Sequence, residues 1–156
     1  MAKNKYNSIT LLYHDAVING EYDASGFPGL PASIYKLDIS LMIKHFLEVD
    51  KVIKSPPGSI LNIENNQEYP IYITFDDGGK SSTSLISSEL NKLNWIGHFF
   101  ITTDYIDRKS FVSKSEIKKL DNEGHVVAVT LVLIHTECLF AHLKRLNMNG
   151  KKAHQS

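Results

Sequence analysis

The sequence predicts an α/β protein with parallel strands, and three segments in the middle of the chain carry that prediction. Ile71 to Phe75 follows Pro70 and is rich in β-branched and aromatic residues, as expected for a strand. Lys80 to Leu93 places its apolar residues on one face of a helix, and Trp95 to Thr102 is a second strand. Alternating strands and helices indicate a parallel sheet, either open or closed into a barrel.

The residues before these segments add one strand and one helix. Ile9 to Tyr13 is a short, mostly apolar run, which predicts a buried strand. A loop rich in glycine and proline follows. Leu37 to Leu47 repeats apolar residues at roughly helical spacing, with Asp38 or Ser40 as the expected N-cap.

A capping box predicts the next helix. Glu116 follows Ser113 by three positions, so the serine oxygen can accept an amide hydrogen bond while the glutamate reaches back to the serine amide. Gly124 is a typical left-handed end of a helix. A third strand is expected to begin at His125.

Composition and charge exclude several classes of partner. The 156 residues are 42% hydrophobic and 22% charged, which is typical of one soluble globular domain. The formal net charge is +0, so charge favours neither a nucleic acid nor an anionic membrane as partner. Cys138 is the single cysteine, which excludes an intrachain disulfide. We find no signal peptide or transmembrane segment, and this indicates a cytoplasmic protein.

Asp76 and Asp77 are the candidate chemical residues. They follow a strand, and the carboxyl ends of parallel strands carry the chemistry of α/β folds. One carboxylate could ligate a divalent metal while the other accepts a proton from metal-bound water. The alternative is a plain turn, because aspartate and glycine are both turn formers. His14 and Asp15 could line the same cleft, or could form a partnered pair on the surface.

Several motifs resemble those of the polysaccharide deacetylases, a family that includes chitin and peptidoglycan deacetylases. Tyr72 to Gly78 resembles the first motif of the family, with its Thr-Phe-Asp-Asp-Gly core. Gly97 to Ile101 resembles the second strand, and Ile117 to Val127 resembles the helix and Gly-His step that precede the second motif. Tyr13 to Asp15 and Ser25 to Gly29 resemble the N-terminal extension of one bacterial subgroup.

The resemblance implies a fold, a reaction and roles for the two aspartates. The fold would be the N-terminal part of a distorted (β/α) barrel with parallel strands, incomplete in this chain. The reaction would be metal-dependent hydrolysis of the amide C–N bond of an N-acetylated carbohydrate, with zinc or another divalent cation. Asp76 would be the catalytic base and Asp77 a metal ligand. Residues 1–69 would form an N-terminal extension with the first strand and helix, and residues 70–127 the start of the deacetylase domain.

The resemblance ends after Val127. The second motif of the family has two metal-binding histidines four positions apart, and Thr130 and Ile134 occupy those positions here. His135 lies one position late, which on a strand turns its side chain to the other face. Because a catalytic zinc takes about three protein ligands, we expect weak metal binding. The alternative to an active deacetylase is therefore an inactive, truncated remnant.

Other histidines could in principle replace the missing ligands. His98, His125 and His135 could form an improvised metal cluster. We favour structural roles, because His98 lies in a strand expected to be buried and His125 follows the end of a helix.

Residues 128–156 differ in composition from the rest of the chain and are expected to be a divergent, frameshifted tail. From Ala141 onward the chain has four basic residues and no acidic residue. One synonymous spelling of Ala128 to Thr136, read with a single base restored, encodes Gly-Ser-His-Ser-Cys-Ser-His-Pro-Tyr, which contains the missing histidines. The strand from His125 would then keep an unpaired edge. That edge and the apolar run Leu131 to Ile134 favour self-association.

The frameshift hypothesis predicts a specific DNA sequence. The gene around the Val127 codon should encode two histidines four codons apart in the neighbouring frame, followed by further deacetylase motifs. Sequencing this region tests the expectation directly. A stop codon directly after Val127 in the neighbouring frame, or the absence of the two histidine codons, would show that the hypothesis is wrong.

Overall fold

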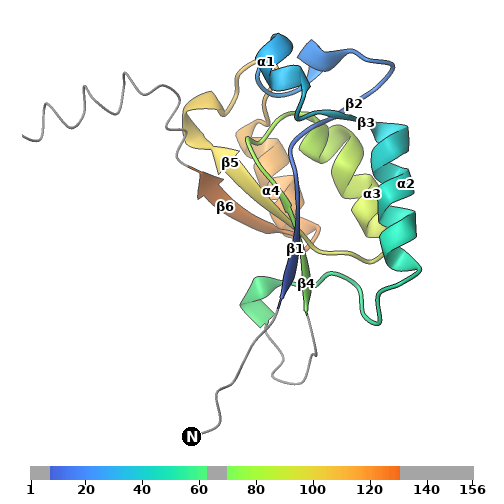
Figure 1. The fold of residues 1–156 in the computed structure, drawn as a ribbon. Coiled ribbons are helices and arrows are strands. Elements are labelled where there is room, and N and C mark those ends of the chain that lie inside the picture. Colours follow the sequence, from blue (N-terminus) through green and yellow to red (C-terminus); the bar gives the residue numbers. More distant parts are fainter. Residues whose placement is uncertain (1–7, 63–69, 131–156) are drawn as a thin grey trace, which may run out of the picture.

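Four parallel strands form the main sheet of this computed structural model, which describes residues 8–62 and 70–130 (Figure 1). Their order is β1-β4-β5-β6, and every neighbouring pair is parallel. The strands are β1 (Ile9–Tyr13), β4 (Ile71–Phe75), β5 (Gly97–Thr102) and β6 (Val126–Thr130). The predicted parallel α/β class is confirmed. The strands in the described ranges do not close into a barrel.

Helices connect the strands and pack against one face of the sheet (Figure 1). Before β4 lies α2 (Ile39–Asp50); between β4 and β5 lie the π-helical segment η3 (Ser82–Ile86) and α3 (Ser87–Lys92); between β5 and β6 lie η4 (Thr103–Tyr105) and α4 (Lys114–Asn122). After β1 comes a small parallel sheet of β2 (Ala16–Val17) and β3 (Leu37–Asp38), with η1 (Tyr22–Ala24) and α1 (Leu30–Ser33) between them. The short η2 (Ile60–Asn62) precedes β4.

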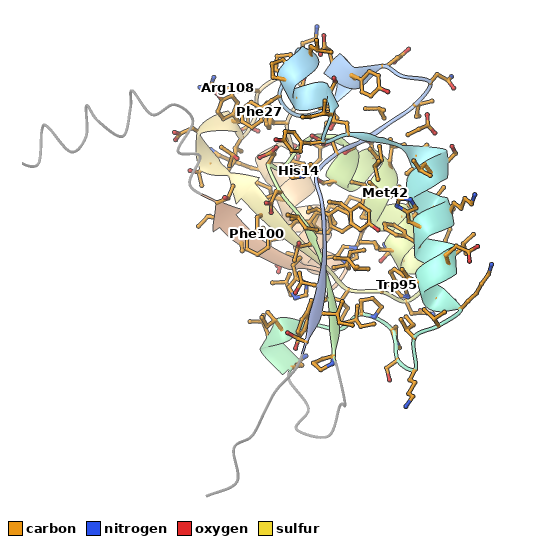
Figure 2. The ribbon with its side chains drawn as sticks, viewed as in Figure 1. His14, Phe27, Met42, Trp95, Phe100 and Arg108 are labelled. Atoms are coloured by element: carbon orange, nitrogen blue, oxygen red, sulfur yellow. The ribbon has the colours of Figure 1, made fainter. Side chains whose placement is uncertain are left out.

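The core lies between the sheet and these helices. Phe75 of β4 stacks on Phe99 of β5 with ring centroids 5.0 Å apart, and Phe46 of α2 lies 5.5 Å from Trp95. Figure 2 shows Met42 and Trp95 on this side of the sheet. A Cβ at Gly97 would lie 2.7 Å from Leu90 Cδ1, so the close approach of α3 to β5 favours a glycine there.

The opposite face of the sheet carries the alternate residues of each strand. His98 lies edge-on to Tyr72 with centroids 5.7 Å apart, and its Nε2 accepts a hydrogen bond from the Ile60 amide at 3.0 Å. Leu12 remains 58% exposed on this face. Helices α2, α3 and α4 all pack on the other side, whereas the short η2 contacts this face through Ile60.

Three sequence expectations needed correction in detail. Ile9 to Tyr13 forms the predicted strand, but it is an edge strand and Ile9 is 49% exposed, so the expectation of a buried strand was wrong. The first long helix begins at Ile39 and not at Leu37, because Leu37 is paired in β3; of the two expected N-caps, Asp38 is confirmed. The helix expected from Lys80 opens with a π-helical segment instead of regular α-helix.

The predicted capping box is confirmed. The Ser113 hydroxyl accepts from the Glu116 amide, and the Glu116 carboxylate accepts from the Ser113 amide at 2.8 Å. Gly124 has φ 86°, the left-handed conformation that ends α4. In the part of the chain that the structure describes, no helix is both long enough and apolar enough to cross a bilayer.

The exposed edge of β6 leads to a test of the predicted self-association. Val129 is 70% exposed on this edge strand. We expect wild-type protein to associate and Val129→Lys to be more monomeric, because a charge on an edge strand opposes pairing with another chain. Sedimentation velocity of the two proteins measures the difference. Val52→Lys is the matched control, since Val52 is 79% exposed in the turn after α2; equal association of all three proteins would contradict the prediction.

Candidate functional site

Asp76 and Asp77 lie in a tight turn at the carboxyl end of β4. The Asp76 amide donates to the Tyr13 carbonyl at 3.0 Å, which extends the pairing of β4 with β1. Asp77 and Gly78 both have φ 74°, a left-handed conformation that aspartate adopts more readily than most side chains. A Cβ at Gly78 would lie 3.1 Å from the Ile101 Cα, so the turn lies directly against β5.

The same edge of the sheet also holds Thr102 and Thr130. The Thr102 amide donates to the Asp77 carbonyl at 3.3 Å, and Thr102 is the register partner of Thr130 on β6. Thr130, at the first expected histidine position, therefore lies at the same edge on β6, and β5 separates it from the strand that carries the aspartate turn. The buried Thr102 hydroxyl has no hydrogen-bond partner among the described residues.

The environment of the aspartate pair raises the pKa of both carboxylates. Burial raises the pKa of Asp76, and the nearby His14 opposes that shift. Burial also raises the pKa of Asp77, and the negative charges of Asp15 and Asp76 raise it further, against His14 and Lys36. A carboxylate with a raised pKa is a stronger base, which suits a proton-accepting role.

Asp15 is buried and does not line an open cleft. Its side chain is 1% exposed, and Oδ1 accepts from the hydroxyls of Ser25 at 2.7 Å and Ser81 at 2.8 Å. The Ser25 oxygen accepts in turn from the Ser81 amide at 2.7 Å, and the Ser81 oxygen accepts from the Ala16 amide at 3.0 Å. The carboxylate thus joins β1, the loop after it and the start of the helix after β4.

Two glycines make room for the Asp15 carboxylate. A Cβ at either Gly26 or Gly79 would overlap its side-chain atoms. Gly79 closes the turn that carries Asp76 and Asp77, so Asp15 packs directly against that turn. Burial raises the pKa of Asp15, and the hydrogen bonds from Ser25 and Ser81 oppose the shift.

Lys36 is a second buried residue of this region, and no sequence motif predicted its burial. Its side chain is 6% exposed, and Nζ donates to the carbonyls of Ser25 and Phe27 at 2.6 Å each and of Tyr22 at 2.5 Å. The ammonium therefore holds the loop between β2 and β3 from inside. The sequence analysis also missed the role of Ser25 and Ser81 as hydrogen-bond donors to Asp15. The signal in the sequence is that each serine lies within two positions of a glycine, Gly26 or Gly79.

His14 is the other residue expected at the cleft, and it remains partly exposed. Its ring lies 5.1 Å from the ring of Tyr35 (Figure 2 labels His14). Its charge acts on both aspartates of the turn, so the structure brings His14 into electrostatic reach of the pair.

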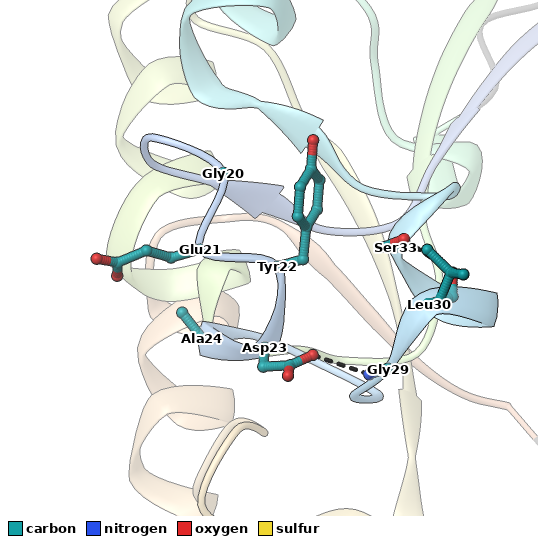
Figure 3. A pocket seen from close by; sticks show the side chains of 8 residues that line it. All are labelled: Gly20, Glu21, Tyr22, Asp23, Ala24, Gly29, Leu30 and Ser33. Carbon is teal, nitrogen blue, oxygen red and sulfur yellow. Dashed lines mark hydrogen bonds between the residues drawn. The ribbon is translucent and has the colours of Figure 1, made fainter.

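Two of the hollows on the described part of the surface are well defined, and neither aspartate of the turn lines either of them. A shallow hollow of about 560 Å³ lies over the loop after β2, between Tyr22 and Leu30 (Figure 3). On its floor the Gly29 amide donates to Asp23 at 2.8 Å. A second hollow, of about 470 Å³, lies between Lys80 and the loop after β5 that contains Arg108.

The described residues do not fit a catalytic zinc. They contain no group of three or more histidine, cysteine, aspartate or glutamate side chains placed to hold a metal. His125 instead has a structural contact, because its Nδ1 accepts from the Gly97 amide at 3.3 Å. Ile134, His135 and Cys138 lie outside the described residues.

Comparison with known proteins agrees with the motifs. Residues 64–132 match the family model described as polysaccharide deacetylase. The resemblance to polysaccharide deacetylases is confirmed. No curated protein sequence matches the chain.

Solved structures show where this fold occurs. A de-N-acetylase from Aggregatibacter actinomycetemcomitans superposes with a TM-score of 0.63 at 18% identity, covering 80% of this chain and 53% of that one. A polysaccharide deacetylase from Bacillus cereus gives 0.60 at 19% identity, with 81% and 39% covered. The IcaB protein of Ammonifex degensii gives 0.56 at 20% identity, with 80% and 52% covered. The chain thus has the fold of part of these deacetylases and spans about half of their length or less.

The packing of Asp15 against Gly79 predicts the behaviour of a double mutant. Gly79→Ala should lower the free energy of unfolding by about 1–3 kcal/mol, because the new methyl group overlaps the Asp15 carboxylate. Asp15→Ala should also destabilise the protein, since two serine hydroxyls lose their acceptor. The double mutant should lose less than the sum of the two, because the overlap is gone. Urea unfolding measures all three values, and strict additivity would contradict the proposed contact.

Proposed function

We propose that this chain derives from enzymes that hydrolyse the amide C–N bond of N-acetylated carbohydrates, with Asp76 as the base and Asp77 as a metal ligand. The observation that carries the proposal is the placement of the carboxylate pair. Both residues lie at the carboxyl end of a parallel strand, in a turn that packs against Asp15 and lies beside β5. The family match over residues 64–132 supports the same reaction.

The residues of the turn could contribute to such a reaction in two ways. The partly buried Asp76 has a raised pKa, so it can take a proton from an attacking water. The orphaned hydroxyl of Thr102 could donate a hydrogen bond to a bound polar group at the same edge. A divalent metal would supply activation of the water in the family reaction. The described donor set does not fit such a metal.

A second candidate is a protein that keeps the fold and the carboxylate pair without catalysis. Thr130 is the specific observation in its favour. It lies at the end of β6, two strands from the β4 end that carries the aspartate turn, at a position where the resemblance places a histidine. A neutral hydroxyl is a poor replacement for imidazole as a zinc ligand. We propose that this second description applies to the chain as written, with deacetylation as the ancestral activity. A cytoplasmic location and an N-acetylated carbohydrate partner remain predictions.

The distinction can be measured directly. We expect no deacetylation of N-acetylglucosamine oligomers above background, with or without added zinc, because Asp77 has too few partner ligands. Release of acetate is the assay. Zinc-dependent turnover that disappears in Asp76→Asn would overturn the inactive description and support catalysis at this turn.

A gain of metal binding provides the matched control. Thr130→His should raise the zinc affinity measured by calorimetry, because it adds an imidazole at the edge that holds Asp77. Adding Asp77→Asn to that variant should remove the gain. If Thr130→His leaves the zinc affinity unchanged, Thr130 and Asp77 are not placed as ligands of one ion.

A further inference from the structure

A group of cationic side chains lines the second hollow. Lys80, Arg108 and Lys109 surround it, together with Asp107 and Glu116. All three cations are exposed, and none lies within ion-pair distance of a carboxylate in the described part of the chain. The chain as a whole has no net charge, so this local excess of positive charge is a property of the hollow.

The two carboxylates of the hollow are already engaged. Asp107 accepts from the Lys114 amide at 3.2 Å. Glu116 accepts from the amide and hydroxyl of Ser113 and from the hydroxyl of Thr83. These bonds direct the carboxylates to the protein, and the ammonium and guanidinium groups remain available to an external anion.

The hollow is held in place by aromatic packing. The Arg108 guanidinium lies 4.5 Å from the centre of the Tyr105 ring, a cation–π contact. Tyr105 contacts Phe27 and Phe111 with ring centroids 4.7 Å away in each case (Figure 2 labels Phe27 and Arg108). A cation ordered before binding loses less side-chain entropy when a ligand arrives.

The hollow is also tied to the aspartate turn. The Lys80 amide donates to the Ser110 carbonyl at 3.0 Å, and the Val112 amide donates to the Gly78 carbonyl at 3.1 Å. Gly79 and Phe111 form an antiparallel bridge between these bonds. Lys80 follows Asp77 by three positions, so the loop after β5 and the turn after β4 form one surface at the carboxyl edge of the sheet.

We propose that this hollow binds an oxyanion group carried by a carbohydrate chain, such as a carboxylate or a sulfate ester. Three cationic residues line it, and guanidinium and ammonium groups make strong charge-assisted hydrogen bonds to such oxygens. That the anion belongs to a carbohydrate rests on the function proposed above, because the loop that lines the hollow is bonded to the turn that carries Asp76 and Asp77. The hollow therefore selects acidic glycans over neutral ones.

Binding of defined oligosaccharides tests the proposal on the full chain. The probes are a galacturonic acid oligomer and a neutral N-acetylglucosamine oligomer of equal length, with sodium sulfate and sodium phosphate as free anions. Amide shifts in NMR report the location and calorimetry the affinity. We expect the acidic oligomer to bind more tightly than the neutral one and than either free anion, with shifts at Lys80 and at 108–113 and weaker binding at high salt.

Two triple variants with the same loss of charge separate the hollow from the general surface. The variant Lys80→Gln/Arg108→Gln/Lys109→Gln should bind the acidic oligomer roughly tenfold more weakly than the wild-type protein. Lys44→Gln/Lys54→Gln/Lys118→Gln, at exposed lysines elsewhere, should leave it unchanged. Circular dichroism establishes that both variants are folded.

Three results would overturn the inference: equal weakening in both triple variants, equal binding of the neutral oligomer, or affinity for free sulfate or phosphate as tight as for the acidic oligomer. Failure of the proposed function is distinguishable, because the binding assay requires no turnover. If the acidic oligomer binds at the hollow while the chain shows neither metal binding nor deacetylation, the proposed reaction is wrong and the anion site is still supported.

Discussion

The described structure depends on the burial of one carboxylate, that of Asp15. Removing a charged group from water is costly unless hydrogen bonds replace the lost hydration. Here two serine hydroxyls donate to it, and two glycines allow the backbone close enough to enclose it. The buried carboxylate joins three segments: the chain just after β1, the loop between β2 and β3 through Ser25, and the chain just before η3 through Ser81. Any change that exposes this group also releases the turn that carries Asp76 and Asp77.

The one-sided arrangement of helices explains why the polar residues gather where they do. With α2, α3 and α4 on one face, Phe75 and Phe99 lie in the core while Thr102 and Thr130 point to the other side. Parallel strands bring their carboxyl ends to one edge, so the aspartate turn and the loop after β5 lie together there. The backbone bonds of 110–112 to that turn then fix both loops as a single surface.

Local chemistry made much of this fold predictable from the sequence. The aromatic and β-branched run before Asp76 defined β4, and the Ser113–Glu116 capping box defined the start of α4, because both signals act over a few residues. Burial was less predictable. β1 has an apolar sequence, which predicts a buried strand, but it lies at the edge of the described sheet. Its burial depends on whether a neighbouring strand covers it, and the local sequence does not encode that.

The site could be predicted only in part. The aspartate pair was found from its position after a strand and from its resemblance to a known motif. The cage around Asp15 was not, because it forms between residues as far apart as 15 and 81. The cationic hollow was missed for the same reason, since Lys80 and Arg108 come together only when two loops pair through backbone bonds.

The three carbonyl contacts of Lys36 have a consequence for how the loop between β2 and β3 responds to its surroundings. Carbonyl oxygens that converge on one point commonly coordinate a potassium or sodium ion, and here a covalently attached ammonium takes that place. The loop therefore carries a covalently attached cation, which dialysis, chelators and changes of salt cannot remove. An amine enclosed in this way should also be among the last in the chain to react with acylating reagents, which would make its slow modification a measure of how often the loop opens.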